Sequence, residues 1–145
     1  MRLYLDTSAL AKRYLHEIGS DDIKHIIFEA ESVAISVVGK VEMFSALSRT
    51  SQYGLGEETI KLASLAFKDD FAGLLFLKLH DGVVNLACET AYKYKIRGFD
   101  AIHLATAQMW MEEVEEMVHF CTFDHQLWYA AKKTKLRVLP EKIQE

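Results

Sequence analysis

The sequence predicts an α/β fold in which a mainly parallel sheet carries helices on both faces. Five short apolar runs alternate with longer segments of helical pattern. Half of the 145 residues are hydrophobic, which is enough for a core in one domain over residues 1–145. One proline and seven glycines occur, and no stretch has the composition of a linker or a repeat. These observations favour one α/β domain over a disordered or repetitive chain.

The five expected strands are short and apolar. They cover residues 3–5, 33–37, 74–79, 118–122 and 137–139. The second, Val-Ala-Ile-Ser-Val, is rich in β-branched residues, as is typical of a buried strand. Short apolar strands that alternate with helices form mainly parallel sheets, and such sheets bind ligands at the carboxyl ends of their strands. That edge is therefore where we expect the chemistry.

Seven helices are expected between and after these strands. They cover residues 8–18, 20–30, 40–53, 57–70, 81–97, 100–116 and 125–133. Ser8 and Ser20 are suitable N-terminal caps, whereas Gly54 and Gly98 are expected to close the helices that precede them. The third and fourth helices are expected to form an antiparallel pair.

Composition excludes several classes of protein. The longest uncharged stretch, residues 101–111, is too short for a membrane span, which needs about 20 apolar residues. Asp6 leaves no room for the apolar region of a signal peptide. Cys88 and Cys121 lack the spacing of a zinc site, and both are expected to be buried thiols in a reducing, cytoplasmic compartment. The net charge of −4 does not favour nucleic-acid binding, but bound divalent metal could supply positive charge.

Four carboxylates stand beside apolar elements, at or just beyond strand ends. Asp6 and Asp124 directly follow strands, Glu42 lies in the first turn of the helix after the second strand, and Asp100 opens a helix. If all four point to one side of the sheet, their repulsion requires cations, and hard oxygen ligands suit Mg²⁺ or Mn²⁺. Such a cluster can hydrolyse phosphodiesters. Each residue alone could also be a helix cap or a first-turn acid.

Four sequence blocks carry a family resemblance. They are Tyr-Leu-Asp-Thr-Ser-Ala-Leu at 4–10, Ser-Val-Val-Gly-Lys-Val-Glu at 36–42, Gly-Phe-Asp-Ala-Ile-His-Leu-Ala-Thr-Ala at 98–107, and Thr-Phe-Asp at 122–124. In order, spacing and length they resemble the PIN-domain family, and within it the VapC-type toxin ribonucleases of prokaryotic VapBC toxin–antitoxin pairs. The resemblance covers nearly the whole chain.

This resemblance implies a three-layer α/β/α sandwich with a five-stranded parallel sheet, and an endoribonuclease that depends on one or two Mg²⁺ or Mn²⁺ ions. It implies that the catalytic, metal-binding acids are Asp6, Glu42, Asp100 and Asp124. Ser8 and Thr122 match the hydroxyl positions that support the site. It also implies an RNA substrate, a homodimer, and a VapB-type antitoxin that docks near the helical pair of residues 43–71.

Other polar residues near these blocks have candidate roles. Lys12, Arg13, Lys40 and Arg97 lie close to the motifs and could contact RNA phosphates. His103 follows Asp100 by three residues, on roughly the same helical face. Because Mg²⁺ prefers oxygen ligands, we expect His103 to pack or hydrogen-bond beneath the site rather than to bind metal.

Two non-enzymatic alternatives remain. A phosphoacceptor receiver domain also has an aspartate after its first strand, but it wants paired acids there and a lysine near the last strand, which Leu139-Pro140 does not provide. A non-catalytic PIN-like binding module would not need the intact set of acids. A dehalogenase-type phosphatase needs Asp-x-Asp, and Ser8 occupies its second position. Metal-dependent RNA cleavage would separate the enzyme from both non-enzymatic alternatives.

Overall fold

A computed structural model describes residues 1–143, in which five parallel strands form one sheet. The strands are β1 (Arg2–Leu5), β2 (Ser32–Ser36), β3 (Leu74–Leu77), β4 (Val118–Cys121) and β5 (Arg137–Leu139). Their order is β3-β2-β1-β4-β5, and all four neighbouring pairs are parallel. The order changes direction at β1, so β1, β2 and β4 meet at the centre of the sheet. The prediction of a parallel five-stranded sheet is confirmed.

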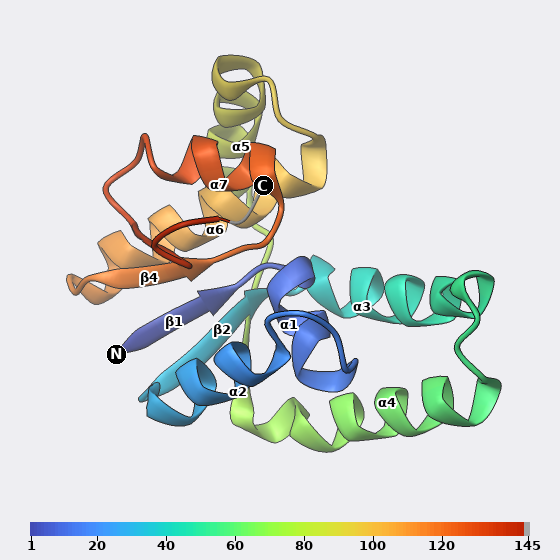
Figure 1. The fold of residues 1–145 in the computed structure, drawn as a ribbon. Helices are drawn as coiled ribbons and strands as arrows, with labels where there is room; N and C mark the ends of the chain where they lie inside the picture. Colours follow the sequence, from blue (N-terminus) through green and yellow to red (C-terminus); the bar gives the residue numbers. More distant parts are fainter. Residues whose placement is uncertain (144–145) are drawn as a thin grey trace.

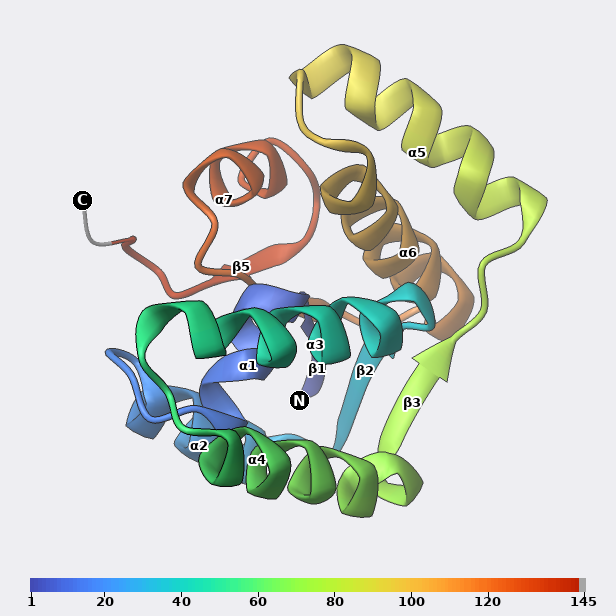
Figure 2. The same ribbon diagram turned by 90° about the vertical axis from the view of Figure 1, so that its right-hand side faces the viewer.

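Helices cover both faces of this sheet (Figures 1 and 2). The helices are α1 (Thr7–Tyr14), α2 (Ser20–Glu29), α3 (Val38–Arg49), α4 (Glu57–Asp69), α5 (Asp81–Tyr94), α6 (Gly98–Val114) and α7 (His125–Ala131). Helices α1 to α4 lie on one side, with α3 and α4 paired along their length, and α5 to α7 lie on the other. The chain is therefore the predicted three-layer α/β/α sandwich.

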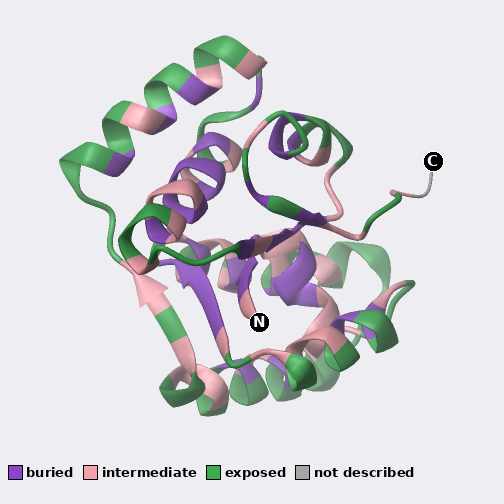
Figure 3. Ribbon diagram, turned by 90° about the vertical axis from the view of Figure 1, so that its left-hand side faces the viewer, coloured by how far each residue is buried: buried purple, intermediate pink, exposed green. Residues whose placement is uncertain are grey.

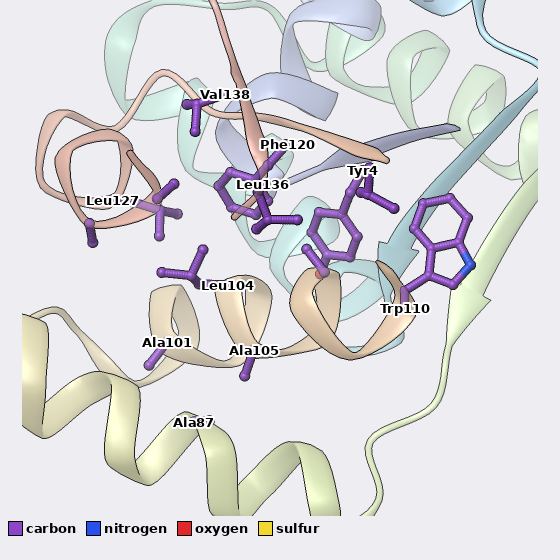
Figure 4. Close-up of a cluster of buried hydrophobic side chains, with 14 of the residues drawn as sticks. Tyr4, Ala87, Ala101, Leu104, Ala105, Trp110, Phe120, Leu127, Leu136 and Val138 are labelled. Atoms are coloured by element: carbon purple, nitrogen blue, oxygen red, sulfur yellow. The ribbon is translucent and has the colours of Figure 1, made fainter. Parts of the chain in front are cut away.

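The strands divide their side chains between two cores. Leu3, Leu5 and Cys121 face the cluster formed with α1 to α4. Tyr4 and Phe120 face the cluster formed with α5 to α7. This alternation follows from the two-residue period of a strand. Figure 3 shows the central strands buried and much of α5 exposed, so α6 is the helix that closes this side of the core. Figure 4 shows Tyr4 between the strands and α6.

Several predicted boundaries are wrong by a few residues. Gly98 does not close α5: Lys95 ends that helix with a φ of 55°, and Gly98 is the first residue of α6. The backbone of Arg97 is extended, and Arg97 occupies the N-cap position of α6. Asp100 is therefore the third residue of α6 rather than its first. Glu42 is the fifth residue of α3 rather than the third, because α3 begins at Val38, two residues earlier than predicted.

The end of α1 and the burial of one cysteine also differ from the prediction. Helix α1 ends at Tyr14 instead of Ile18, because the backbone of Leu15 becomes extended. Cys121 is buried as expected, but Cys88 is exposed on α5, so the expectation of two buried thiols is wrong for Cys88. Within residues 1–143, no helix combines the length and apolar character that a bilayer crossing requires.

Candidate active site

A cavity of about 740 Å³ lies beside the start of α1 and brings the four predicted acids together. Asp6, Glu42, Asp100 and Asp124 all line its wall. They come from four places in the chain: the end of β1, α3, the first turn of α6, and the loop after β4. The acids that the sequence placed near strand ends therefore share one cavity, although each belongs to a different element.

Asp6 is nearly completely buried, with 3% of its surface exposed. It caps α1 by accepting the Ala9 N–H at 2.9 Å. Ser8 Oγ donates to its two oxygens at 2.7 and 2.9 Å, and Thr122 Oγ1 donates at 2.7 Å. Burial raises the pKa of Asp6, and these donors offset part of that effect. Ser8 and Thr122 thus contact Asp6 as the supporting role requires.

Two side chains form hydrogen bonds with the same oxygen of Glu42. Thr7 Oγ1 donates to Glu42 Oε1 at 2.9 Å, and His103 Nε2 lies 2.5 Å from the same oxygen. Burial would raise the pKa of Glu42, but the hydrogen bonds from His103 and Thr7 bring it below the ordinary value. Gly39 allows this placement, because a Cβ there would lie 2.4 Å from the Ile35 side chain. The close approach of α3 to β2 at Gly39 therefore sets the position of Glu42, which lies about one turn further along α3.

Arg97 bridges the other two acids. Its Nε donates to Asp100 Oδ2 at 3.0 Å and its Nη2 donates to Asp124 Oδ2 at 2.9 Å. The Arg97 side chain is 73% exposed, so these ion pairs are partly solvated. Asp124 also caps α7 by accepting the Leu127 N–H. Burial raises the pKa of Asp100, and Arg97 opposes that rise.

The remaining predicted contact residues lie outside the cavity lining. Lys12 Nζ donates to the Ile18 carbonyl and lies over the Phe123 ring. Arg13 donates to Asp70 at 2.8 Å. Lys40 lies over the rings of Phe71 and Phe76, 4.6 and 4.1 Å from their centroids. Of the four basic candidates, only Arg97 lines the cavity.

The cavity also contains residues that the sequence analysis did not select. Arg49 lies at the end of α3, and an apolar wall comes from α5 and α6. The wall includes Val84, Cys88 and Phe99. Phe99 precedes Asp100 within the recognised block, and that adjacency was the one signal available for it. Arg49, Val84 and Cys88 lie outside every block, so their presence in the cavity lining depends on how the helices pack.

The donor set suits a hard divalent cation. Four carboxylates that line one cavity offer oxygen ligands of the kind that Mg²⁺ and Mn²⁺ prefer. As the side chains stand, no three His, Cys, Asp or Glu residues within 1–143 form a group ready to hold an ion. Arg97 engages one oxygen of Asp100 and one of Asp124. The residues fit a metal chemically, and the guanidinium supplies positive charge beside them.

Comparison with known proteins identifies relatives over most of the chain. Ribonuclease VapC47 of Mycobacterium tuberculosis is 33% identical over 129 residues, which cover 86% of each chain. Ribonuclease VapC46 of the same species is 29% identical over 137 residues, covering 94% of this chain and 95% of that protein. Among solved structures, a toxin–antitoxin complex from Klebsiella pneumoniae has a chain with a TM-score of 0.66 at 14% identity, covering 99% and 100% of the two chains.

The family assignment agrees with the site geometry. Residues 3–133 match the model of the PIN domain. That range contains the sheet except for Arg2 and the last strand, and it includes all four acids of the cavity. The predicted resemblance is therefore confirmed, and this chain belongs to the PIN-domain family.

Proposed function

We propose that this protein is an Mg²⁺- or Mn²⁺-dependent endoribonuclease and the toxin of a toxin–antitoxin pair. The observation that carries this proposal is the convergence of Asp6, Glu42, Asp100 and Asp124 on one cavity. Relatives named ribonucleases align with 86% or more of the chain, which supports RNA as the substrate. A binding module would need no such set of acids, and a receiver domain would need a second acid beside Asp6, where Thr7 and Ser8 stand.

The four acids would hold one or two ions. A bound divalent cation would supply a water of lowered pKa and neutralise charge on the phosphate. Asp6 would provide a fixed oxygen, because its position is set by three hydrogen-bonding neighbours. Asp100 and Asp124 would exchange their Arg97 contacts for the ion. Glu42 or Asp124 would orient the attacking water.

Arg97 has a second role in this scheme. Once released from the carboxylates, its exposed guanidinium would lie at the cavity wall and contact the RNA backbone. Arg49 lines the same cavity and could contact a neighbouring phosphate. Lys12, Arg13 and Lys40 would contribute only from outside the cavity, since each already contacts other groups in the chain.

A small antitoxin is the proposed partner, and a homodimer the proposed assembly. The structural neighbour from Klebsiella pneumoniae is part of a toxin–antitoxin complex, which supports a protein partner of this kind. The antitoxin would block cleavage by inserting a basic side chain among the acids, where Arg97 already demonstrates that a guanidinium fits. An antitoxin that binds the chain should therefore suppress its cleavage of RNA.

Cleavage of total cellular RNA tests the function. We expect purified, antitoxin-free protein to cut RNA in Mg²⁺ or Mn²⁺ and to be inactive in EDTA. Asp6→Asn should lower the rate by about a thousandfold or more, because a lost metal ligand removes several kcal/mol of transition-state stabilisation. Asp69→Asn, an exposed acid of α4, is the matched control and should cut normally. Cleavage that survives EDTA, or that Asp6→Asn retains in full, would contradict the proposal.

A further inference from the structure

A buried hydrogen-bonded chain of polar groups runs behind Glu42. The Ser36 N–H donates to Tyr4 Oη at 3.0 Å. Tyr4 Oη lies 2.9 Å from His103 Nδ1, and His103 Nε2 reaches Glu42 Oε1. Tyr4 is 0% exposed and His103 1%. A polar chain this deep costs stability unless every member is bonded, so its presence beneath a cavity acid calls for a reason.

Hydrogen-bond chemistry places a hydrogen on His103 Nε2. Glu42 Oε1 is a carboxylate oxygen, which accepts and cannot donate, so the ring nitrogen that contacts it is the donor. Tyr4 Oη, which accepts the Ser36 N–H, bonds the opposite ring nitrogen, Nδ1. Tyr4 thus holds the ring in the orientation that points the Nε2–H at Glu42.

The two oxygens of Glu42 have different surroundings. Oε1 accepts from both His103 Nε2 and Thr7 Oγ1. Within residues 1–143, no hydrogen bond to Oε2 is found. Glu42 is partly exposed and lines the cavity, whereas His103 is almost inaccessible. One oxygen is therefore held by the fold, and the other is left for a ligand.

We infer that His103, oriented by Tyr4, is a positioning residue that holds Glu42 by Oε1 and leaves Oε2 to the bound ion or its water. This inference rests on the proposed metal-dependent function. His103 itself contacts neither ion nor RNA in this arrangement. Neighbours that orient a ligand through its second atom commonly affect metal affinity by about 10- to 100-fold. The pattern requires a donor at Nε2, not merely a side chain that fills the space.

Three variants separate positioning from packing. His103→Leu keeps apolar bulk but loses the donor, and we expect Mn²⁺ affinity to fall about 10- to 100-fold. His103→Gln can place an amide N–H near Oε1, and we expect it to recover most of that loss. Leu104→Ala is the control, because Leu104 is a fully buried neighbour of His103 on α6. This substitution should lower thermal stability without changing Mn²⁺ affinity.

The measurement is calorimetric titration with Mn²⁺ at a temperature where circular dichroism finds every variant folded, paired with kcat and KM for RNA cleavage. We expect His103→Leu to lower kcat while KM for RNA changes little. Wild-type affinity in His103→Leu would overturn the inference, and so would equal losses in the Leu and Gln variants. Wild-type protein that binds no Mn²⁺ and cuts no RNA would instead overturn the proposed function, and the inference with it.

Discussion

The four acids of the cavity form two pairs that the fold holds by opposite means. Asp6 and Glu42 are tied to the interior by hydroxyls, an imidazole and a backbone N–H. Asp100 and Asp124 are tied to each other by the exposed guanidinium of Arg97. Interior contacts cannot be exchanged without disturbing the core, whereas a solvated ion pair is worth only about 0.2–1 kcal/mol.

This difference suggests a division of labour. The interior pair would keep its geometry whether or not an ion is bound, and so would define where the ion sits. The pair bridged by Arg97 would remain neutralised until an ion arrives, which limits the repulsion between Asp100 and Asp124 in the metal-free protein. Substitutions at either pair test this division, and their expected effects on Mn²⁺ affinity and stability differ in size and in sign.

The largest effect is expected at the interior pair. Thr122→Val removes the hydroxyl that donates to Asp6 Oδ2 and leaves a buried carboxylate with one donor fewer. We expect a loss of about 1–3 kcal/mol in the free energy of unfolding and weaker Mn²⁺ binding. Thr90→Val is the control, because among residues 1–143 the buried Thr90 hydroxyl bonds only the Leu86 carbonyl of its own helix. Denaturant melts and Mn²⁺ titration would check both; a normal Mn²⁺ affinity in Thr122→Val would contradict the fixed role of Asp6.

An effect of opposite sign is expected at Asp100 and Asp124, the pair bridged by Arg97. Arg97→Gln removes the competing cation, so Mn²⁺ should bind about threefold to tenfold more tightly in the absence of RNA. Arg2→Gln provides a matched control, since Arg2 pairs with Glu116 at 2.9 Å at the other end of β1. Electron paramagnetic resonance of free Mn²⁺ would measure the affinity. Weaker binding by Arg97→Gln would mean that the guanidinium helps to assemble the site instead of competing for it.

The two pairs also differ in how far the sequence predicted them. All four acids that the sequence analysis selected line the cavity, because strand ends and helix starts are visible in local patterns. Their role as metal ligands stays a prediction. Ser8 and Thr122 were expected to support the site, and both bond Asp6. His103 was expected beneath the site, and it bonds Glu42. The link from His103 to Tyr4 was not predicted, since the two residues are 99 positions apart and meet only when α6 packs on the sheet. Arg97 was selected as a phosphate contact, and its bridge to Asp124 depends on the same packing.

Local errors had equally local causes. Gly98 is the kind of residue that often closes a helix, and yet a non-glycine, Lys95, takes the left-handed conformation that ends α5. Cys88 lies in an apolar run that suggested burial, but α5 is the outer helix, so only part of its surface meets α6. Which helix lies outermost is decided by the chain's path and not by the composition of one segment.

The smallest effect is a pH dependence at Asp100 in the metal-free protein. Burial raises the pKa of Asp100 above 3.8, and Arg97 counteracts part of that rise. As pH increases from about 4, the unfolded chain loses this proton before the folded chain does, so the free energy of unfolding decreases until the folded-state pKa is passed. Asp100→Asn has no such proton to lose, and its stability relative to wild type should increase over that window and then level off. Urea denaturation in EDTA at a series of pH values would measure this, with Asp69→Asn as the exposed control.

Combining Asp100→Asn with Arg97→Gln tests the role of the guanidinium. Without Arg97 the pKa of Asp100 rises further, so the stabilising effect of Asp100→Asn should be larger in the Arg97→Gln background. An equal effect in both backgrounds would mean that Arg97 does not lower the pKa of Asp100 in the folded protein.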